Sequence, residues 1–184
     1  KNVDKENLAS IPWATLDPNT HLVTCLGTKG GMQCGRALVI GCGLGDDADA
    51  LAKAGYEVDA IDISPTAIKL AKERFPSDRI DFRVEDIFNL PASMSGVYDF
   101  VFESRTIQSL DPKFRDELIG IIAGLVVKGG ELIVHTNIQN DDQAFGGPPW
   151  PLYRKELLDF EKHGLKIVYQ NEKMISRPVA PYDA

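Results

Sequence analysis

The chain has 184 residues, of which 43% are hydrophobic and 26% are charged, and its formal net charge is −7 at pH 7. This length is enough for one domain with its own hydrophobic core, and the acidic charge argues against a protein that mainly binds nucleic acid or anionic lipid. No apolar run reaches the roughly 18 residues of a membrane-spanning helix, so we expect a single cytoplasmic domain over residues 1–184 that acts as a monomer.

Strand-like and helix-like patterns alternate along the chain. The helix over residues 64–74 has the clearest start, because Ser64 is a good N-cap and Pro65 suits the first helical position. In chain order, the patterns predict a helix over 17–26, a strand over 36–40, a helix over 46–54, a strand over 56–62, the helix over 64–74, strands over 80–86 and 98–104, a helix over 111–128, a strand over 131–136, a helix over 154–163 and a strand over 165–175.

This alternation predicts an α/β fold with a Rossmann-like, doubly wound, mostly parallel sheet and helices on both faces. Residues 36–136 would form the ligand-binding core, and residues 1–30 a helical lid in front of it. Residues 137–184 would supply a lid loop followed by a helix and a strand. The three cysteines form no CxxC pair and do not cluster with the histidines, which indicates reduced thiols and no metal site.

The turn Gly41-Cys42-Gly43-Leu44-Gly45 follows the first predicted strand and is the best candidate for a ligand site. In doubly wound sheets the ligand lies at the carboxyl ends of the strands, and glycine lets it approach the backbone closely. Dinucleotides and S-adenosylmethionine both use this geometry. Both ligands also place a carboxylate at the end of the second strand to bind ribose hydroxyls, and Asp62 fits that position.

Two aspartates directly after the turn distinguish between these ligands. A pyrophosphate at the helix N-terminus would face Asp46 and Asp47, and like charges at such a distance repel each other. The dinucleotide motif also requires a third glycine where this chain has Asp46. S-adenosylmethionine carries an ammonium and a sulfonium group and no phosphate, so the acidic residues favour it.

Polar residues also follow the third and fourth predicted strands. Asp86 and Ile87 come after the third strand, where an adenine ring would be covered and its amino group accepted. Glu103 and Ser104 end the fourth strand, where the reacting centre is expected. A charge directly after the apolar segment "DFVF" is costly unless it faces a pocket or a partner.

Several motifs in this order resemble class I S-adenosylmethionine-dependent methyltransferases. They are "IPWATLDPN", "ALVIGCGLGDDADALAKAGYEVDAIDISPTAI", "VEDIF", "YDFVFESRTIQSLDP", "VKGGELIVHT" and "GGPPWPLYRKEL". Within that class the chain is similar to the thiopurine methyltransferase-like branch, which includes halide, thiol and tellurite methylating enzymes. The resemblance implies the methyltransferase fold, S-adenosylmethionine as cofactor and a small-molecule acceptor. From the net charge and the absence of a long apolar run, we expect no nucleic-acid or membrane partner.

The resemblance also implies which residues contact the cofactor. Trp13 would lie over it from the N-terminal lid. The remaining contacts that the resemblance implies are Gly41, Cys42 and Gly43 at the methionine end, Asp62 at the ribose, Ile63, Asp86 and Ile87 around the adenine, and Glu103 and Ser104 near the methionine or the acceptor.

The expected reaction is a direct displacement of the methyl group from the sulfonium. A soft nucleophile such as a thiolate or halide needs no base, whereas an oxygen or nitrogen acceptor usually does. Glu103 and His135 are the candidate catalytic bases. Two alternatives remain at this stage, a nicotinamide-dependent oxidoreductase and a non-catalytic S-adenosylmethionine-binding protein of the same fold.

Overall fold

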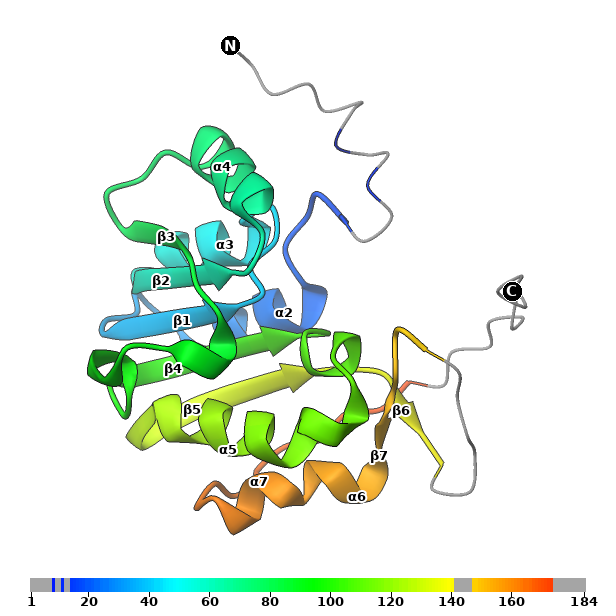
Figure 1. The fold of residues 1–184 in the computed structure, drawn as a ribbon. Coiled ribbons are helices and arrows are strands. Elements are labelled where there is room, and N and C mark those ends of the chain that lie inside the picture. Colours follow the sequence, from blue (N-terminus) through cyan, green and yellow to red (C-terminus); the bar gives the residue numbers. More distant parts are fainter. Residues whose placement is uncertain (1–7, 9–10, 12–13, 141–146, 174–184) are drawn as a thin grey trace.

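A computed structural model of the chain describes residues 8, 11, 14–140 and 147–173. Its centre is a five-stranded sheet in the order β3-β2-β1-β4-β5, and all neighbouring strands pair in parallel. The strands are β1 (Arg36–Ile40), β2 (Glu57–Asp62), β3 (Ile80–Val84), β4 (Tyr98–Ser104) and β5 (Val126–His135). The carboxyl ends of these strands therefore meet at one edge of the sheet, and the arrows in Figure 1 point to that edge.

Helices cover both faces of the sheet, as the sequence predicts. The longer helices are α2 (Thr20–Lys29), α3 (Asp46–Ala54), α4 (Pro65–Arg74) and α5 (Arg115–Leu125). Figure 1 shows α2 and α3 behind the sheet and α5 in front of it. Two short helices, α6 (Arg154–Leu157) and α7 (Asp159–Lys162), follow beyond β5. None of the helices in the described ranges has both the length and the apolar character that crossing a membrane requires.

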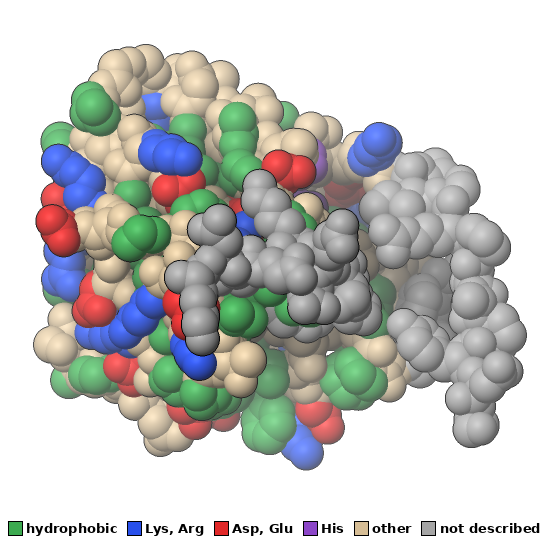
Figure 2. All heavy atoms as spheres, turned by 90° about the horizontal axis from the view of Figure 1, so that it is seen from above, with side chains coloured by type: hydrophobic (Ala, Val, Ile, Leu, Met, Phe, Trp, Pro, Cys, Tyr) green, Lys and Arg blue, Asp and Glu red, His purple; other side chains and the backbone are tan. Residues whose placement is uncertain are grey.

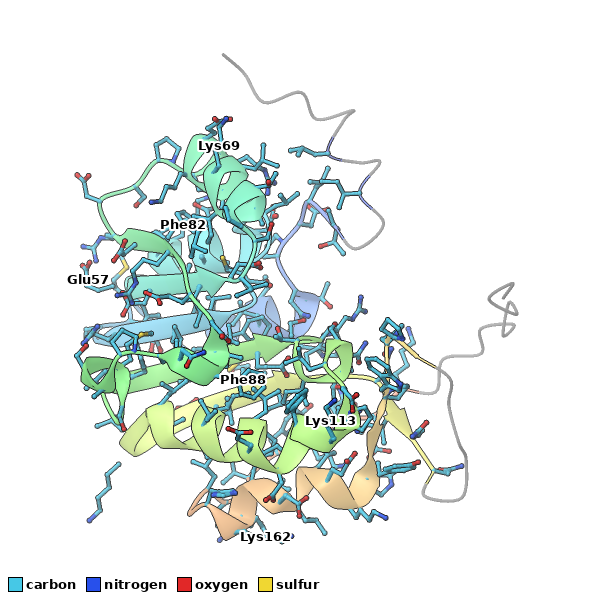
Figure 3. The ribbon with its side chains drawn as sticks, in the orientation of Figure 1. Glu57, Lys69, Phe82, Phe88, Lys113 and Lys162 are labelled. Atoms are coloured by element: carbon cyan, nitrogen blue, oxygen red, sulfur yellow. The ribbon has the colours of Figure 1, made fainter. Side chains whose placement is uncertain are left out.

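Each face of the sheet is covered by helices and buries its own hydrophobic cluster. One cluster joins alternate residues of β1, β2 and β4 to α2, α3 and α4, and it includes Phe82. The other joins the opposite residues to α5 and α7, and Phe88 packs against it. Figure 3 labels both phenylalanines. The near-continuous apolar runs of β1 and β4 thus reflect burial on both faces.

Local capping explains where the helices begin. Ser64 Oγ accepts a hydrogen bond from the backbone N–H of Ala67 at 3.2 Å, with Pro65 in the first position of α4, which confirms the predicted start. The N-terminal helix begins later than predicted, at Thr20 instead of residue 17. Its cap is Asn19, whose Oδ1 accepts from the N–H of His21 at 2.9 Å.

The strand predicted over residues 165–175 is wrong for its described part, because residues 165–173 form no strand. Val168 and Tyr169 are 88% and 78% exposed. Alternation of apolar and polar residues shows that a segment suits a strand, but a strand also needs a pairing partner. Residues 174 and 175 lie outside the described part of the chain.

The helix predicted over 111–128 also differs from the structure. It is divided into a short 3₁₀ turn, η4 (Pro112–Phe114), and α5, which ends at Leu125. β5 begins directly at Val126, so residues 126–128 belong to the strand and not to the predicted helix. Between β5 and α6, where the sequence analysis expects a lid loop, the chain forms a small parallel pair of β6 (Ile138–Gln139) and β7 (Leu152–Tyr153).

A buried arginine attaches this late segment to the main body. Arg115 is 4% exposed, and its guanidinium donates to the carbonyl oxygens of Trp150 and Pro151 at 2.5 and 3.1 Å. It also forms an ion pair with Glu156 at 2.5 Å. In addition, the N–H of Trp150 donates to the carbonyl of Gln108 at 2.7 Å. Arg115 therefore joins α5 to β7 and α6 by polar contacts, beside the apolar packing of Leu152 and Leu157 against the same cluster as α5.

Candidate active site

A cavity of about 1110 Å³ opens at the carboxyl ends of the strands. It lies where the strand order reverses, because the chain proceeds from β1 to β2 and β3 on one side and to β4 and β5 on the other. This is the place where doubly wound folds bind ligands. Its walls come from the start of α2, the glycine turn after β1, and the ends of the other strands. Among the predicted contacts, Gly41, Cys42, Gly43, Asp62, Ile63, Asp86, Ile87, Ser104 and His135 line it.

The glycine turn needs its glycines. Gly41 and Gly43 have φ values of +62° and +52°, a region that glycine adopts at little cost. A Cβ on Gly41 would lie 2.2 Å from Thr106 Oγ1. Asp62 connects this turn to the end of β2, since its Oδ2 accepts from the N–H of Gly43 at 2.9 Å and its Oδ1 from Ser64 at 2.8 Å. Asp62 thus shapes the cavity wall that it also lines.

The two acidic side chains after the turn, Asp46 and Asp47, already have hydrogen-bonding partners within the protein. Asp46 forms a two-pronged ion pair with Arg74, with both N–O distances at 2.7 Å. Asp47 Oδ1 accepts from the backbone N–H of Asn19 at 2.6 Å. Burial raises the pKa of Asp47 and Asp46 adds to this, while the N–H of Asn19 opposes it. The electrostatic argument against phosphate therefore rests mainly on Asp47.

The predicted adenine-binding residues are grouped at one end of the cavity. Ile63 is 68% exposed, which leaves an apolar surface available to a flat ring. Asp86 caps a short 3₁₀ turn, η1 (Ile87–Asn89), by accepting from the N–H of Phe88 at 3.0 Å. Its other oxygen accepts from Asn89 Nδ2 at 2.6 Å. Asp86 therefore already has two donors within its own turn.

A polar cluster forms the other end of the cavity, and the sequence analysis identified only two of its members. Ser104 Oγ and His135 Nδ1 lie 3.1 Å apart. Asn19 Nδ2 is 2.9 Å from the same His135 nitrogen and 3.4 Å from Ser104 Oγ. The ring of His21 lies 5.2 Å from that of His135. Asn19 ends the motif "IPWATLDPN" quoted above, and its helix-capping position is a further signal that could have pointed to it.

The hydrogen bonds of Asn19 fix the tautomer of His135. Because Asn19 Oδ1 accepts from His21, its other terminal atom is the nitrogen, which is a donor. His135 Nδ1 accepts that hydrogen bond and is therefore unprotonated. Burial lowers the pKa of His135, and the nearby Arg105 and His21 lower it further. His135 is thus neutral at pH 7, with its Nδ1 lone pair already engaged.

Glu103 does not line the cavity. Its side chain is fully buried, and its Oε1 accepts from the backbone N–H groups of Thr106 and Ile107 at 2.5 and 3.0 Å. Burial raises the pKa of Glu103 to about 7, although these hydrogen bonds lower it. The structure therefore places the predicted base behind the turn that follows β4. Trp13 lies outside the described residues.

The strand order and the cavity at the switch point define a Rossmann-like protein that binds a nucleoside-containing cofactor. The chain belongs to the thiopurine S-methyltransferase family, whose model matches residues 5–178. It is therefore an S-adenosylmethionine-dependent methyltransferase, and the predicted family, fold class, enzyme class and cofactor are confirmed. Neither the oxidoreductase nor the non-catalytic alternative is favoured.

Individual relatives agree with this assignment. "Probable thiol methyltransferase 2" of Arabidopsis thaliana is 31% identical over 86% of this chain and 72% of its own length. "Thiocyanate methyltransferase 1" of the same plant is 30% identical over 88% of this chain and 70% of its own length. The solved structure of magnesium protoporphyrin IX methyltransferase from Synechocystis PCC 6803 with bound SAM has a TM-score of 0.65 over 81% of this chain and 68% of that chain. At 19% identity, that likeness concerns the fold.

Proposed function

We propose that this enzyme methylates a small, soft nucleophile, either a thiol or an anion such as thiocyanate, by direct displacement. When bound, S-adenosylmethionine supplies the methyl group: the acceptor's lone pair forms a bond to the methyl carbon, the sulfonium–methyl bond breaks, and S-adenosylhomocysteine leaves as a neutral thioether. The main support is the position of Glu103, the expected base. Its carboxylate points into the protein and not into the cavity.

The other titratable group at the acceptor end supports the same choice. Since His135 Nδ1 accepts a hydrogen bond from Asn19, it has no lone pair left there for a proton from the acceptor. A thiolate or thiocyanate needs no proton removal, whereas a phenol or amine does. Alignment of the reactants and exclusion of water can then supply much of the acceleration. The names of the two plant relatives point to the same acceptors.

The cavity suits the cofactor at each end. The glycine turn is open to the methionine portion, and Gly41 has no room for a Cβ beside Thr106. Asp62 would accept hydrogen bonds from the ribose through the lone pairs that its backbone contacts leave free. Ile63, Asp86 and Ile87 would hold the adenine, Cys42 and Gly43 the methionine, and Ser104 the reacting end. We assign Trp13 to the lid over the cofactor.

The wider organisation follows from the same proposal. We assign the chain to one domain, with residues 1–30 as an N-terminal lid, residues 36–136 as the cofactor-binding core and residues 137–184 as the later lid segment. A cytoplasmic, monomeric enzyme that does not act on nucleic acid fits the net charge of −7. On the face in Figure 2, basic and acidic side chains are interspersed, which is unlike a nucleic-acid-binding surface.

An acceptor screen with a labelled methyl donor tests the proposed function. Thiols, thiocyanate, halides, chalcogen oxyanions and phenols would be compared by kcat/KM at equal cofactor saturation. We expect thiols or thiocyanate to exceed phenols by at least about 100-fold, since a missing general base costs about 10²–10⁴-fold. A phenol turned over as fast as the best thiol would contradict the proposal.

Replacing Asp62 tests the placement of the ribose. We expect Asp62→Ala to weaken S-adenosylmethionine binding by about 1–3 kcal/mol, because a half-buried acceptor of several hydrogen bonds is lost. Isothermal titration calorimetry measures this. Asp81→Ala is the control, since that side chain is 63% exposed on the neighbouring strand, and its affinity should equal that of the wild type. Unchanged affinity in the Asp62 variant would place the ribose elsewhere.

A further inference from the structure

Arg105 adopts a backbone conformation that few residues other than glycine tolerate. Its φ is +65°, in the left-handed region where a side chain is strained. Such residues occur most often at functional sites, where the surrounding structure holds them in place. Arg105 lines the cavity, and its backbone N–H donates to the carbonyl of His135 at 2.9 Å. The strained residue therefore sits beside the acceptor end.

Contacts on both sides of Arg105 maintain this turn. Before it, Glu103 Oε1 accepts from the N–H groups of Thr106 and Ile107. After it, Thr106 Oγ1 donates to the carbonyl of Ile40 at 3.2 Å, in the space that a side chain on Gly41 would fill. The chain must reverse sharply at Arg105 for these bonds to form. Glu103 is thus a positioning residue for the turn.

The guanidinium of Arg105 has no carboxylate partner among the described residues. Every other arginine in that part of the chain forms an ion pair, namely Arg36, Arg74, Arg79, Arg83, Arg115 and Arg154. Asp47 also lines the cavity, but its Oδ1 accepts a hydrogen bond from the backbone N–H of Asn19. An arginine at a cavity wall with no internal counter-ion is suited to an anionic ligand.

Arg105 lies near the polar cluster around His135, at the proposed acceptor end of the cavity. Burial lowers the pKa of His135, and the nearby positive charge of Arg105 lowers it further; both residues line the same cavity. The members of that cluster are neutral and supply hydrogen bonds without charge. Arg105 is therefore the cationic group at this end of the cavity within the described residues.

We propose that Arg105 is the specificity-determining residue that binds the acceptor as an anion, in the orientation set by the turn that Glu103 caps. This inference rests on the proposed soft-nucleophile acceptor and adds that its negative charge is recognised by the protein. The guanidinium offers planar N–H donors and a fixed positive charge. A thiol bound beside it is stabilised as its thiolate, and thiocyanate is bound directly.

Thiocyanate binding to the enzyme saturated with S-adenosylhomocysteine tests this inference without turnover. By calorimetry we expect Arg105→Gln to bind thiocyanate at least about 10-fold more weakly, as for a lost charge-assisted contact, and Arg105→Lys to recover part of the affinity. The control Arg79→Gln alters an exposed arginine directly before β3, which pairs with Glu57 at the amino end of β2, and should match the wild type. S-adenosylhomocysteine affinity should be equal in all four proteins.

A second variant separates recognition from a purely structural role. Arg105→Gly relieves the strained φ, so we expect its unfolding temperature to rise by about 2–4 °C, while thiocyanate binding falls as in Arg105→Gln. In turnover, both variants should raise the KM for thiocyanate with kcat changed less than about 3-fold, as expected when binding in the ground state is lost.

The outcomes separate this inference from the proposed function. Wild-type affinity for thiocyanate in Arg105→Gln, or no thiocyanate binding by the wild type, would overturn the role of Arg105. Turnover of neutral thiols would still support the proposed function in either case. Conversely, anion binding that depends on Arg105 in a protein that methylates no thiol and no thiocyanate would support the anion site and refute the proposed function.

Discussion

Replacing Arg115 with alanine is expected to destabilise the protein by about 3 kcal/mol. This buried guanidinium has one ion pair with Glu156 and two hydrogen bonds to the carbonyls of Trp150 and Pro151. Removing one partner of a buried pair costs about 3–5 kcal/mol, and the lower end applies because the Glu156 side chain is 17% exposed. Urea unfolding followed by circular dichroism measures the change.

The position of Arg115 also predicts where the structure loosens. Arg115 makes the polar contacts between α5 and the segment of β7 and α6, so the backbone amides of that segment should exchange hydrogen faster in Arg115→Ala, while those of β1 and β4 change little. The control Arg79→Ala removes an exposed arginine–glutamate pair, with side chains 55% and 61% exposed, and should be close to the wild type. Equal stability of the two variants would show that Arg115 does not anchor the late segment.

Glu103 is expected to make the stability of the protein depend on pH. Its pKa is raised to about 7 in the folded state from 4.5, so the folded protein holds this proton more tightly than the unfolded chain. The contribution is complete below about pH 4.5 and is lost as the pH rises through about 7. Between about pH 5 and pH 8, wild-type stability should therefore fall by about 2–3 kcal/mol relative to Glu103→Gln.

Comparison with Glu103→Gln isolates this effect, because all other titrating groups are present in both proteins. Glutamine keeps an acceptor for the N–H groups of Thr106 and Ile107 but has no proton to lose. Its amide nitrogen replaces Oε2, which is buried without a hydrogen-bond partner in the structure, so the variant will start from a lower stability at acid pH. A stability difference that stays constant across the pH range would mean that Glu103 ionises with an ordinary pKa.

Local sequence patterns predicted most of the fold. Helix α4 begins where Ser64 and Pro65 place it, and α3 matches its predicted span. The errors are the late start of α2, the span of the helix over 111–128 and the strand over 165–173. The 165–173 segment has strand-like alternation but no neighbouring strand to pair with, and pairing depends on distant residues.

The sequence by itself determined that the glycine turn and Asp62 meet at one edge of the sheet, where we propose that the cofactor binds. The glycine turn and Asp62 are adjacent to strand ends, and all parallel strands end at the same edge, so their convergence follows from the pattern alone. These residues do line one cavity. The local sequence pattern was enough to predict their position, because each of these residues directly follows or ends its own strand.

Only the tertiary structure decided which residues form the polar cluster around His135, and which charges near the cavity are paired. Asn19 meets Ser104 and His135, which are far from it in the chain, and Arg74 neutralises Asp46 across two helices. Glu103 looked like a base, but the turn after β4 directs its carboxylate toward backbone amides and leaves Arg105 at the cavity. Which way a side chain points, and which distant group balances its charge, depends on packing between elements and not on local pattern.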